Sequence, residues 1–205
     1  MPLLTVASLC VLLAAVPLCA QPVPNSTATS DGFDWKGALQ DSAFFLSVQH
    51  GFRLTERVTR REFDGKFFPD WKHAITHTKD GFFDGSAHPI KENFLGHPAQ
   101  GAVSYHIARH RGASRKVAFL WTTLYSVQFE IGPASEASLG NVGLSPQDLV
   151  FTPLLGTGEA LLEEWVDGKI DLLPPSKKRT LLRCVLLTKS VANLMRFKHP
   201  AYRGN

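Results

Sequence analysis

Apolar residues recur at intervals of three and four along several segments, and this spacing limits the possible fold more than any other feature. It is clear in residues 35–54, WKGALQDSAFFLSVQHGFRL, and in residues 116–132, KVAFLWTTLYSVQFEIG. Such spacing places the apolar side chains on one face of an α-helix. We therefore predict an all-α protein, a single bundle of about five helices with irregular, aromatic-rich connections. Gly51 is expected to end the first helix.

The N-terminus has the pattern of a secretory leader. Residues 1–20 form a charge-free apolar run that ends in Leu-Cys-Ala and is followed by polar residues. We predict a signal peptide over residues 1–20, a flexible linker over 21–33 and a single helical domain over 34–205. An uncleaved membrane anchor is the alternative. The expected location is the periplasm or a membrane-associated position in a bacterial envelope.

Cysteine usage agrees with this compartment. Two of the three cysteines lie in the leader, so Cys184 alone remains in the predicted mature chain. No intrachain disulfide can form there, and the fold must depend on packing, which suits a periplasmic or membrane-associated bacterial protein. Cys184 follows Leu-Leu-Arg and precedes Val-Leu-Leu, and we interpret it as a core residue rather than a nucleophile.

Positive charge is concentrated at the C-terminus. Residues 166–205 carry nine Lys or Arg and two Asp, while the whole chain has a net charge of +4. We predict a basic C-terminal helix, for which two roles stay open. It lies on an anionic membrane surface or envelope lipid, or it docks on the domain with a solvated basic face. Nucleic acid is not an expected partner, because the chain is predicted to be exported and has no recognition motif.

A helix that opens at His97-Pro98 is predicted to have a face of small residues. On a helix, Gly101, Ser104 and Ala108 lie near the same face as His97. Small side chains allow a second helix to approach closely. Glu130 is predicted near the C-terminal end of another helix, where the helix dipole disfavours an anion, so a buried Glu130 needs a cation, a donor or a proton.

A third helix start is predicted at Ser145. Ser145 is suited to the N-cap, Pro146 to the first helical position and Asp148 to the third, so capping is the expected main role of Asp148. Pro153 and the glycines at 156 and 158 follow at short intervals, and they predict a kink or break in this helix.

Six polar residues are predicted to gather in one buried cluster, because each lies on the polar side of an otherwise apolar helix. A buried carboxylate without a partner costs several kcal/mol, which favours mutual satisfaction. Gly96 and Gly101 are expected to clear space for the helix that carries Glu130. The candidates are His97, Glu130 and Asp148 as catalytic residues, and Ser126, Glu136 and Glu159 as ligand-binding residues.

Two histidine pairs have the spacing of metal ligands on a helix, His73 with His77 and His106 with His110. Neither pair has a third ligand nearby in the sequence, nor the glutamate of a zinc protease motif. We interpret them as surface histidines and predict no metal and no cofactor. Standard catalytic signatures are absent from the sequence.

Three segments, in order, resemble uncharacterised bacterial envelope proteins that carry a domain of unknown function. They are NFLGHPAQGAVSYHIAR, YSVQFEIGPASEASLGN and SPQDLVFTPLLGTGEALLEE. The resemblance implies a His-Pro helix, a helix ending in Glu and a Ser-Pro-x-Asp-Leu helix, but no reaction. A more distant similarity to VanZ-like membrane proteins implies roles for His97, Glu130, Asp148 and Gly156.

Two function classes follow. The first is a non-enzymatic envelope module, in which the His/Glu/Asp cluster fixes the register of the helices. The second is a membrane-associated enzyme, or a metal- or ligand-binding protein, that acts on an envelope lipid or glycan. In that class His97 is the base or ligand, and Glu130 or Asp148 orients it. The sequence favours the first class slightly.

Overall fold

The computed structural model describes residues 32–61, 65–76, 95–132 and 145–195. This part of the chain forms seven helices and no strand, which confirms the all-α prediction. The predicted signal peptide and most of the linker lie outside the described residues, as does Glu136. The helices are α2 (Trp35–Thr59), α3 (Phe67–Thr76), α4 (His97–His110), α5 (Arg115–Ile131), α6 (Pro146–Asp171), α7 (Lys177–Cys184) and α8 (Leu187–Met195).

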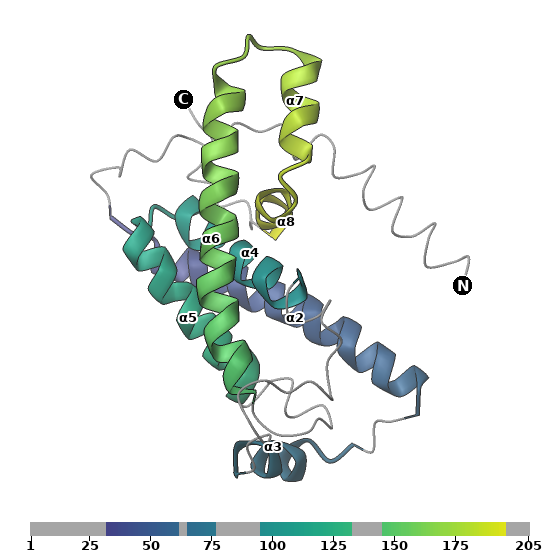
Figure 1. Ribbon diagram of the computed structural model, residues 1–205. Helices are drawn as coiled ribbons and strands as arrows, with labels where there is room; N and C mark the ends of the chain where they lie inside the picture. The colour runs from purple at the N-terminus through teal and green to yellow at the C-terminus, as the bar shows by residue number, and fades with distance from the viewer. Residues whose placement is uncertain (1–31, 62–64, 77–94, 133–144, 196–205) are drawn as a thin grey trace.

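Helix α4 lies at the centre of the bundle, in contact with α2, α5, α6 and α8 (Figure 1). Every residue of α4 except Ala99 and Arg109 is buried. Its sequence, HPAQGAVSYHIARH, is only weakly apolar. Two of its polar side chains, His106 and Arg109, bond to the Glu163 and Glu164 carboxylates of α6, which offsets part of the cost of burying them. The central helix therefore contributes buried polar residues as well as apolar ones to the interior of the bundle.

The core consists largely of small residues. One buried cluster joins Tyr105 of α4 to alanines of α4, α5 and α6, including Ala118 and Ala160. A second cluster joins Ile107 of α4 to Phe45 of α2 and to residues of α5 and α8. Small side chains keep the helix axes close, so polar groups on neighbouring helices come within bonding distance.

Gly101 and Gly156 form the crossing point of α4 and α6. A Cβ atom added to Gly156 would lie 2.7 Å from the Gly101 Cα, so the two backbones are in contact. The prediction of a small-residue face on α4 is confirmed. The predicted partner of that face was wrong, because Gly101 faces α6 rather than the Glu130 helix, and Gly96 borders open space.

The predicted end of the first helix at Gly51 is wrong, and the kink or break predicted near Pro153 does not occur as a break. Helix α2 continues through Gly51 to Thr59, and α6 is one continuous helix of 26 residues that includes Pro153. An internal proline removes one backbone hydrogen bond and an internal glycine costs about 1 kcal/mol, and tertiary packing can outweigh both. In α6 the residues that pack are Thr152, Pro153 and Gly156, all of them buried.

The C-terminal region forms two helices where one was predicted. Helix α7 ends at Cys184 and α8 begins at Leu187. The break occurs where the Glu163 carboxylate of α6 accepts hydrogen bonds from the backbone N–H groups of Thr188 and Lys189, at 3.2 and 2.8 Å. A carboxylate there caps the first turn of α8, so α6 fixes where α8 begins. Across the described ranges, no helix combines the length and apolar character needed to cross a membrane.

Candidate functional site

Three helix ends bring the predicted catalytic residues together. His97 is the first residue of α4, behind Gly96 at the N-cap and ahead of Pro98. Glu130 is the penultimate residue of α5. Asp148 lies in the first turn of α6, where its backbone N–H donates to the Ser145 hydroxyl at 3.4 Å. The predicted helix start at Ser145 is confirmed, and it places the Asp148 side chain against α4.

His97, Glu130 and Asp148 form a compact, buried cluster. Their residues are 4, 8 and 2 % exposed. One ring nitrogen or carboxylate oxygen from each residue lies within 4.8 Å of the other two. His97 Nε2 and Asp148 Oδ2 lie 3.6 Å apart. The predicted convergence of these three side chains is therefore confirmed.

The spacing of these atoms fits a shared cation better than a direct hydrogen bond. A hydrogen bond between N–H and a carboxylate spans about 2.7–3.2 Å, so 3.6 Å between His97 Nε2 and Asp148 Oδ2 is too long. Donor atoms around a tetrahedral metal ion, each about 2.1 Å from the ion, are separated by about 3.4 Å. Side-chain shifts of less than about 1 Å would bring all three donors to that separation.

Neighbouring side chains hold the cluster in place. The Ser126 hydroxyl of α5 donates to the Asp148 carbonyl at 3.3 Å and ties α5 to the first turn of α6. The Phe129 ring packs edge-on against His97 with 6.4 Å between centroids, and His50 of α2 stacks on the same Phe129 at 5.4 Å. One turn along α6, the Thr152 hydroxyl is buried with no hydrogen-bond partner among the described residues.

Glu159 does not join this cluster. It lies three turns beyond Asp148 on α6, about 16 Å away at 1.5 Å per residue. Burial raises the pKa of Glu159, and the nearby Glu163 carboxylate raises it further. Glu159 therefore belongs to a different acidic region of α6. Of the two predicted ligand-binding residues that the structure describes, Ser126 contacts the cluster, through the Asp148 carbonyl.

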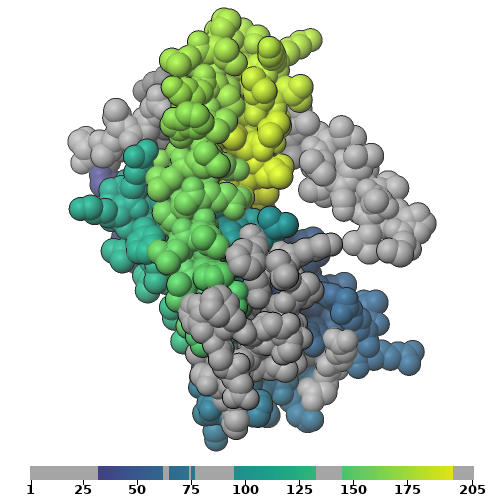
Figure 2. All heavy atoms as spheres, viewed as in Figure 1, coloured from purple at the N-terminus to yellow at the C-terminus, as the bar shows by residue number. Residues whose placement is uncertain are grey.

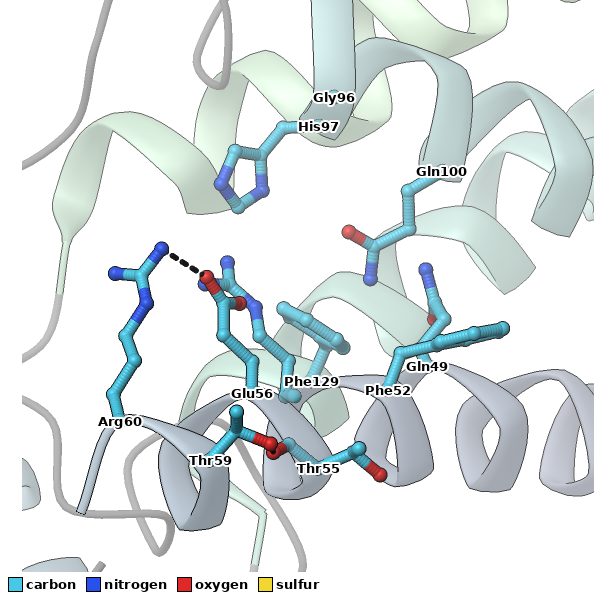
Figure 3. Close-up of a pocket in the computed structure, with 11 residues that line it drawn as sticks. Gln49, Phe52, Thr55, Glu56, Thr59, Arg60, Gly96, His97, Gln100 and Phe129 are labelled. Carbon is cyan, nitrogen blue, oxygen red and sulfur yellow. Dashed lines mark hydrogen bonds and ion pairs between the residues drawn. The ribbon is translucent and has the colours of Figure 1, made fainter. Parts of the chain in front are cut away.

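A cleft of about 710 Å³ borders the cluster (Figure 3). It lies between the C-terminal half of α2 and the start of α4, and its lining includes Phe52, Gln100 and Phe129. His97 also lines it and points from α4 toward the α2 side chains (Figure 3). On the opposite wall Arg60 pairs with Glu56 at 2.7 Å. His97 thus belongs both to the buried cluster and to the wall of the cleft.

Comparison with known proteins finds similarity to one family model, in the part of the chain that contains the cluster. Residues 83–184 match the family described as Domain of unknown function (DUF3943). This DUF3943 region contains helices α4 to α7 and all three cluster residues. It agrees with the expected resemblance to an uncharacterised family, while the VanZ-like similarity finds no support. No curated protein and no solved structure matches the chain.

The DUF3943 region holds a second buried polar group that the sequence interpretation missed. His106 and His110 of α4 are buried with their rings stacked at 6.1 Å, so the surface assignment of this pair was wrong. His73 is exposed on α3, and His77 lies outside the described residues. His106 Nε2 is 3.1 Å from the Glu163 carboxylate, which Thr188 also contacts. His106 and His110, whose i, i+4 spacing we interpreted as a surface pair, lie on the buried side of α4.

The ionisation of this second group is set by burial and by hydrogen bonds. Burial lowers the pKa of His106, although Glu163 opposes the shift. For Glu163, burial acts to raise the pKa, but the hydrogen bonds from His106 and Thr188 outweigh it and the pKa is lowered. Neutral His106 therefore faces ionised Glu163, an arrangement that holds α8 against α4 and α6.

Proposed function

We propose that the protein binds a divalent first-row transition metal ion through His97, Glu130 and Asp148. The observation that carries this proposal is the set of three buried donor atoms within 4.8 Å of one another. One imidazole nitrogen with two carboxylate oxygens is a ligand set suited to Zn²⁺, Mn²⁺ or Fe²⁺. The separation of 3.6 Å between His97 Nε2 and Asp148 Oδ2 supports it further.

Electrostatics favours the same proposal. Two carboxylates, Glu130 and Asp148, are buried and lie close together, and such a pair of acidic oxygen donors is a favourable environment for a divalent cation. A divalent ion between the two carboxylates would balance both negative charges at once. Metal binding in this protein would therefore stabilise the junction of α4, α5 and α6.

Three protein ligands leave room for a further ligand on the metal. Catalytic zinc sites have this number of protein ligands, with water or substrate in the remaining position, whereas structural sites have four. Because His97 also lines the cleft, a molecule bound in the cleft would lie beside the metal ligand. Metal-assisted hydrolysis, in which the ion lowers the pKa of bound water, is the reaction class we propose for this site.

A non-enzymatic role is the competing proposal, and one contact favours it. The hydrogen bond from Ser126 to the Asp148 carbonyl joins two helices without any metal. In that role the cluster fixes how α4, α5 and α6 dock. An envelope location is proposed for either role, supported by the leader pattern of residues 1–20. Intact-mass measurement of the exported protein tests the leader, and a chain that still contains residues 1–20 would contradict cleavage.

Metal titration distinguishes the two roles. The full chain is treated with a chelator, dialysed and titrated calorimetrically with Zn²⁺, Mn²⁺ or Co²⁺. We expect one ion to bind per chain, and Asp148→Asn to bind it at least about 100-fold more weakly. Loss of a residue that only hydrogen-bonds to a metal ligand already lowers metal affinity about 10- to 100-fold, and loss of a ligand should lower it at least as much. Glu159→Gln is the matched control on the same helix, and it should bind as the unmodified chain does.

The spectrum of the Co²⁺-loaded protein tests the open position. Visible absorption of bound Co²⁺ should change when azide or inorganic phosphate is added, because a small anion replaces the water ligand. A spectrum unaffected by either anion would contradict a catalytic-type site. The metal site itself would be contradicted if none of the three metals bound, or if Asp148→Asn bound metal as tightly as the unmodified chain. The non-enzymatic role, in which the cluster fixes how α4, α5 and α6 dock, would then remain.

A further inference from the structure

The turn between α6 and α7 exposes apolar residues at one extremity of the molecule. We call residues 172–178 the α6–α7 tip. All seven residues are exposed, and Leu172 is 78 % exposed. The ends of α6 and α7 project beyond the other helices (Figure 1), and the space-filling view shows this extremity formed by the same two segments (Figure 2). Leu172 and Leu173 are adjacent in the chain, and together they give this projecting turn an apolar surface that a partner could cover.

Positive charge surrounds these apolar side chains. Lys177 and Lys178 are exposed residues of the tip, and Lys169 lies less than one turn before it on α6. None of the three forms an ion pair among the described residues. Lys169 instead places its ammonium group 5.7 Å from the ring centre of Trp165, a side chain that is 62 % exposed. Trp beside Lys is the combination found at membrane–water interfaces.

The acidic residues near the tip are neutralised within the fold. Asp171 pairs with Arg179 and Arg183, and Asp167 pairs with Arg183 at 3.0 Å and with Lys189 at 2.6 Å. The carboxylates therefore contribute little negative potential, and the lysines determine the charge that an approaching surface meets.

The same contacts make the tip rigid. Arg179 Nη1 donates to the Leu173 carbonyl at 3.2 Å, and the Ser176 hydroxyl accepts from the Arg179 backbone N–H at 3.2 Å as the N-cap of α7. A turn whose backbone is ordered before binding loses less conformational entropy on binding than a flexible one would.

We propose that the α6–α7 tip inserts Leu172 and Leu173 into the surface of an anionic phospholipid membrane, where Lys177 and Lys178 contact the headgroups. This interaction is independent of the metal site. Apolar insertion combined with several lysines is the pairing of signals that gives peripheral membrane binding. The positive charge of the tip favours an anionic membrane over two other possible occupants. A second copy of the protein would bring an equally basic tip, and residues 196–205 of the same chain contain Arg and Lys with no acidic residue, so the charges would be alike in both cases.

Vesicle sedimentation tests the proposal with the full chain. The vesicles contain about one third phosphatidylglycerol in phosphatidylcholine, and pure phosphatidylcholine vesicles serve as the neutral comparison. We expect binding to the anionic vesicles that weakens when NaCl is raised from about 0.05 to about 0.5 M. The double variant K177Q/K178Q should bind about 25-fold more weakly, at roughly fivefold per lysine. Leu172→Gln should also bind more weakly.

Matched variants control for charge, apolar exposure and the leader. K36Q/K116Q removes two exposed lysines elsewhere, and Leu154→Gln removes an exposed leucine near the other end of α6. The tip variants and the controls all keep residues 1–20, so any contribution of the leader to vesicle binding is the same in every variant. Equal binding by the tip variants and their controls would overturn the proposal. It would also be overturned if Leu172→Gln dissociated an oligomer in the absence of vesicles, since the tip would then contact a second copy.

Discussion

At the scale of single residues, Asp41 and Arg111 form an ion pair that is buried in the fold. Arg111 Nε and Nη2 lie 2.8 and 2.9 Å from the two Asp41 oxygens, and Asp41 is fully buried. Burial by itself would lower the pKa of Arg111, but the hydrogen bonds and charge of Asp41 outweigh it and raise the pKa. This pair joins α2 to the C-terminal end of α4.

Arg111→Ala should reduce the free energy of unfolding by about 3–5 kcal/mol, because it leaves the Asp41 carboxylate buried without its main partner. Arg115→Ala is the control, since its ion pair with Glu164 involves a side chain that is 68 % exposed, and it should cost less than about 1 kcal/mol. Urea unfolding measures both. Similar losses for the two variants would contradict the importance of the buried pair.

The His106–Glu163 contact predicts how stability depends on pH. The pKa of His106 is lowered from 6.5, so below that pH the unfolded chain binds a proton that the folded chain excludes. Stability from this group is complete above pH 6.5 and is lost as the pH falls toward the lowered pKa. Glu163, whose pKa is also lowered, adds a second loss at more acidic pH.

Urea midpoints measured between about pH 5 and pH 8 test this dependence. The unmodified chain should become less stable below pH 6.5, and His106→Gln should show a smaller decrease over the same range. His73→Gln, which changes an exposed histidine of α3, is expected to keep the full dependence. An unchanged slope in His106→Gln would show that other groups are responsible.

At the scale of elements, the contact of α4 with α6 decides where the site residues lie. Gly101 and Gly156 let the two backbones touch, and this contact brings Asp148, two turns before Gly156, to the level of His97. The site therefore depends on residues that have no functional group of their own.

Gly156→Ala should reduce the free energy of unfolding by about 1–3 kcal/mol, because the added methyl would lie 2.7 Å from the Gly101 Cα. Gly158→Ala, in the same helix with open space around the new methyl, should stabilise the protein by about 0.5–1 kcal/mol. Thermal unfolding followed by circular dichroism measures both changes. A Gly156→Ala protein as stable as Gly158→Ala would mean that the helices are not in contact there.

At the scale of the whole molecule, metal binding and folding should be linked. If the cluster holds an ion in the folded state alone, a free metal concentration of about 100 times Kd adds about 2.7 kcal/mol to the free energy of unfolding. Addition of a chelator should therefore lower the melting temperature of the unmodified chain. In Asp148→Asn the chelator should have no effect, and an equal decrease there would indicate binding elsewhere.

The sequence was sufficient for the all-α class, for the start of α6 and for the convergence of His97, Glu130 and Asp148. Helical spacing and capping are local, so residues within a few positions determine them. Burial of polar residues on apolar helices has a known cost, which made it reasonable to expect that these three side chains meet.

Tertiary structure alone decided the remaining features. Pro153 did not break α6 and Gly51 did not end α2, because packing outweighs a local preference of a few kcal/mol. The division of the C-terminal region into α7 and α8, and the burial of His106 against Glu163, depend on side chains far apart in the sequence. Such contacts follow from how helices dock, and helical periodicity specifies which face is buried without specifying the neighbour it meets.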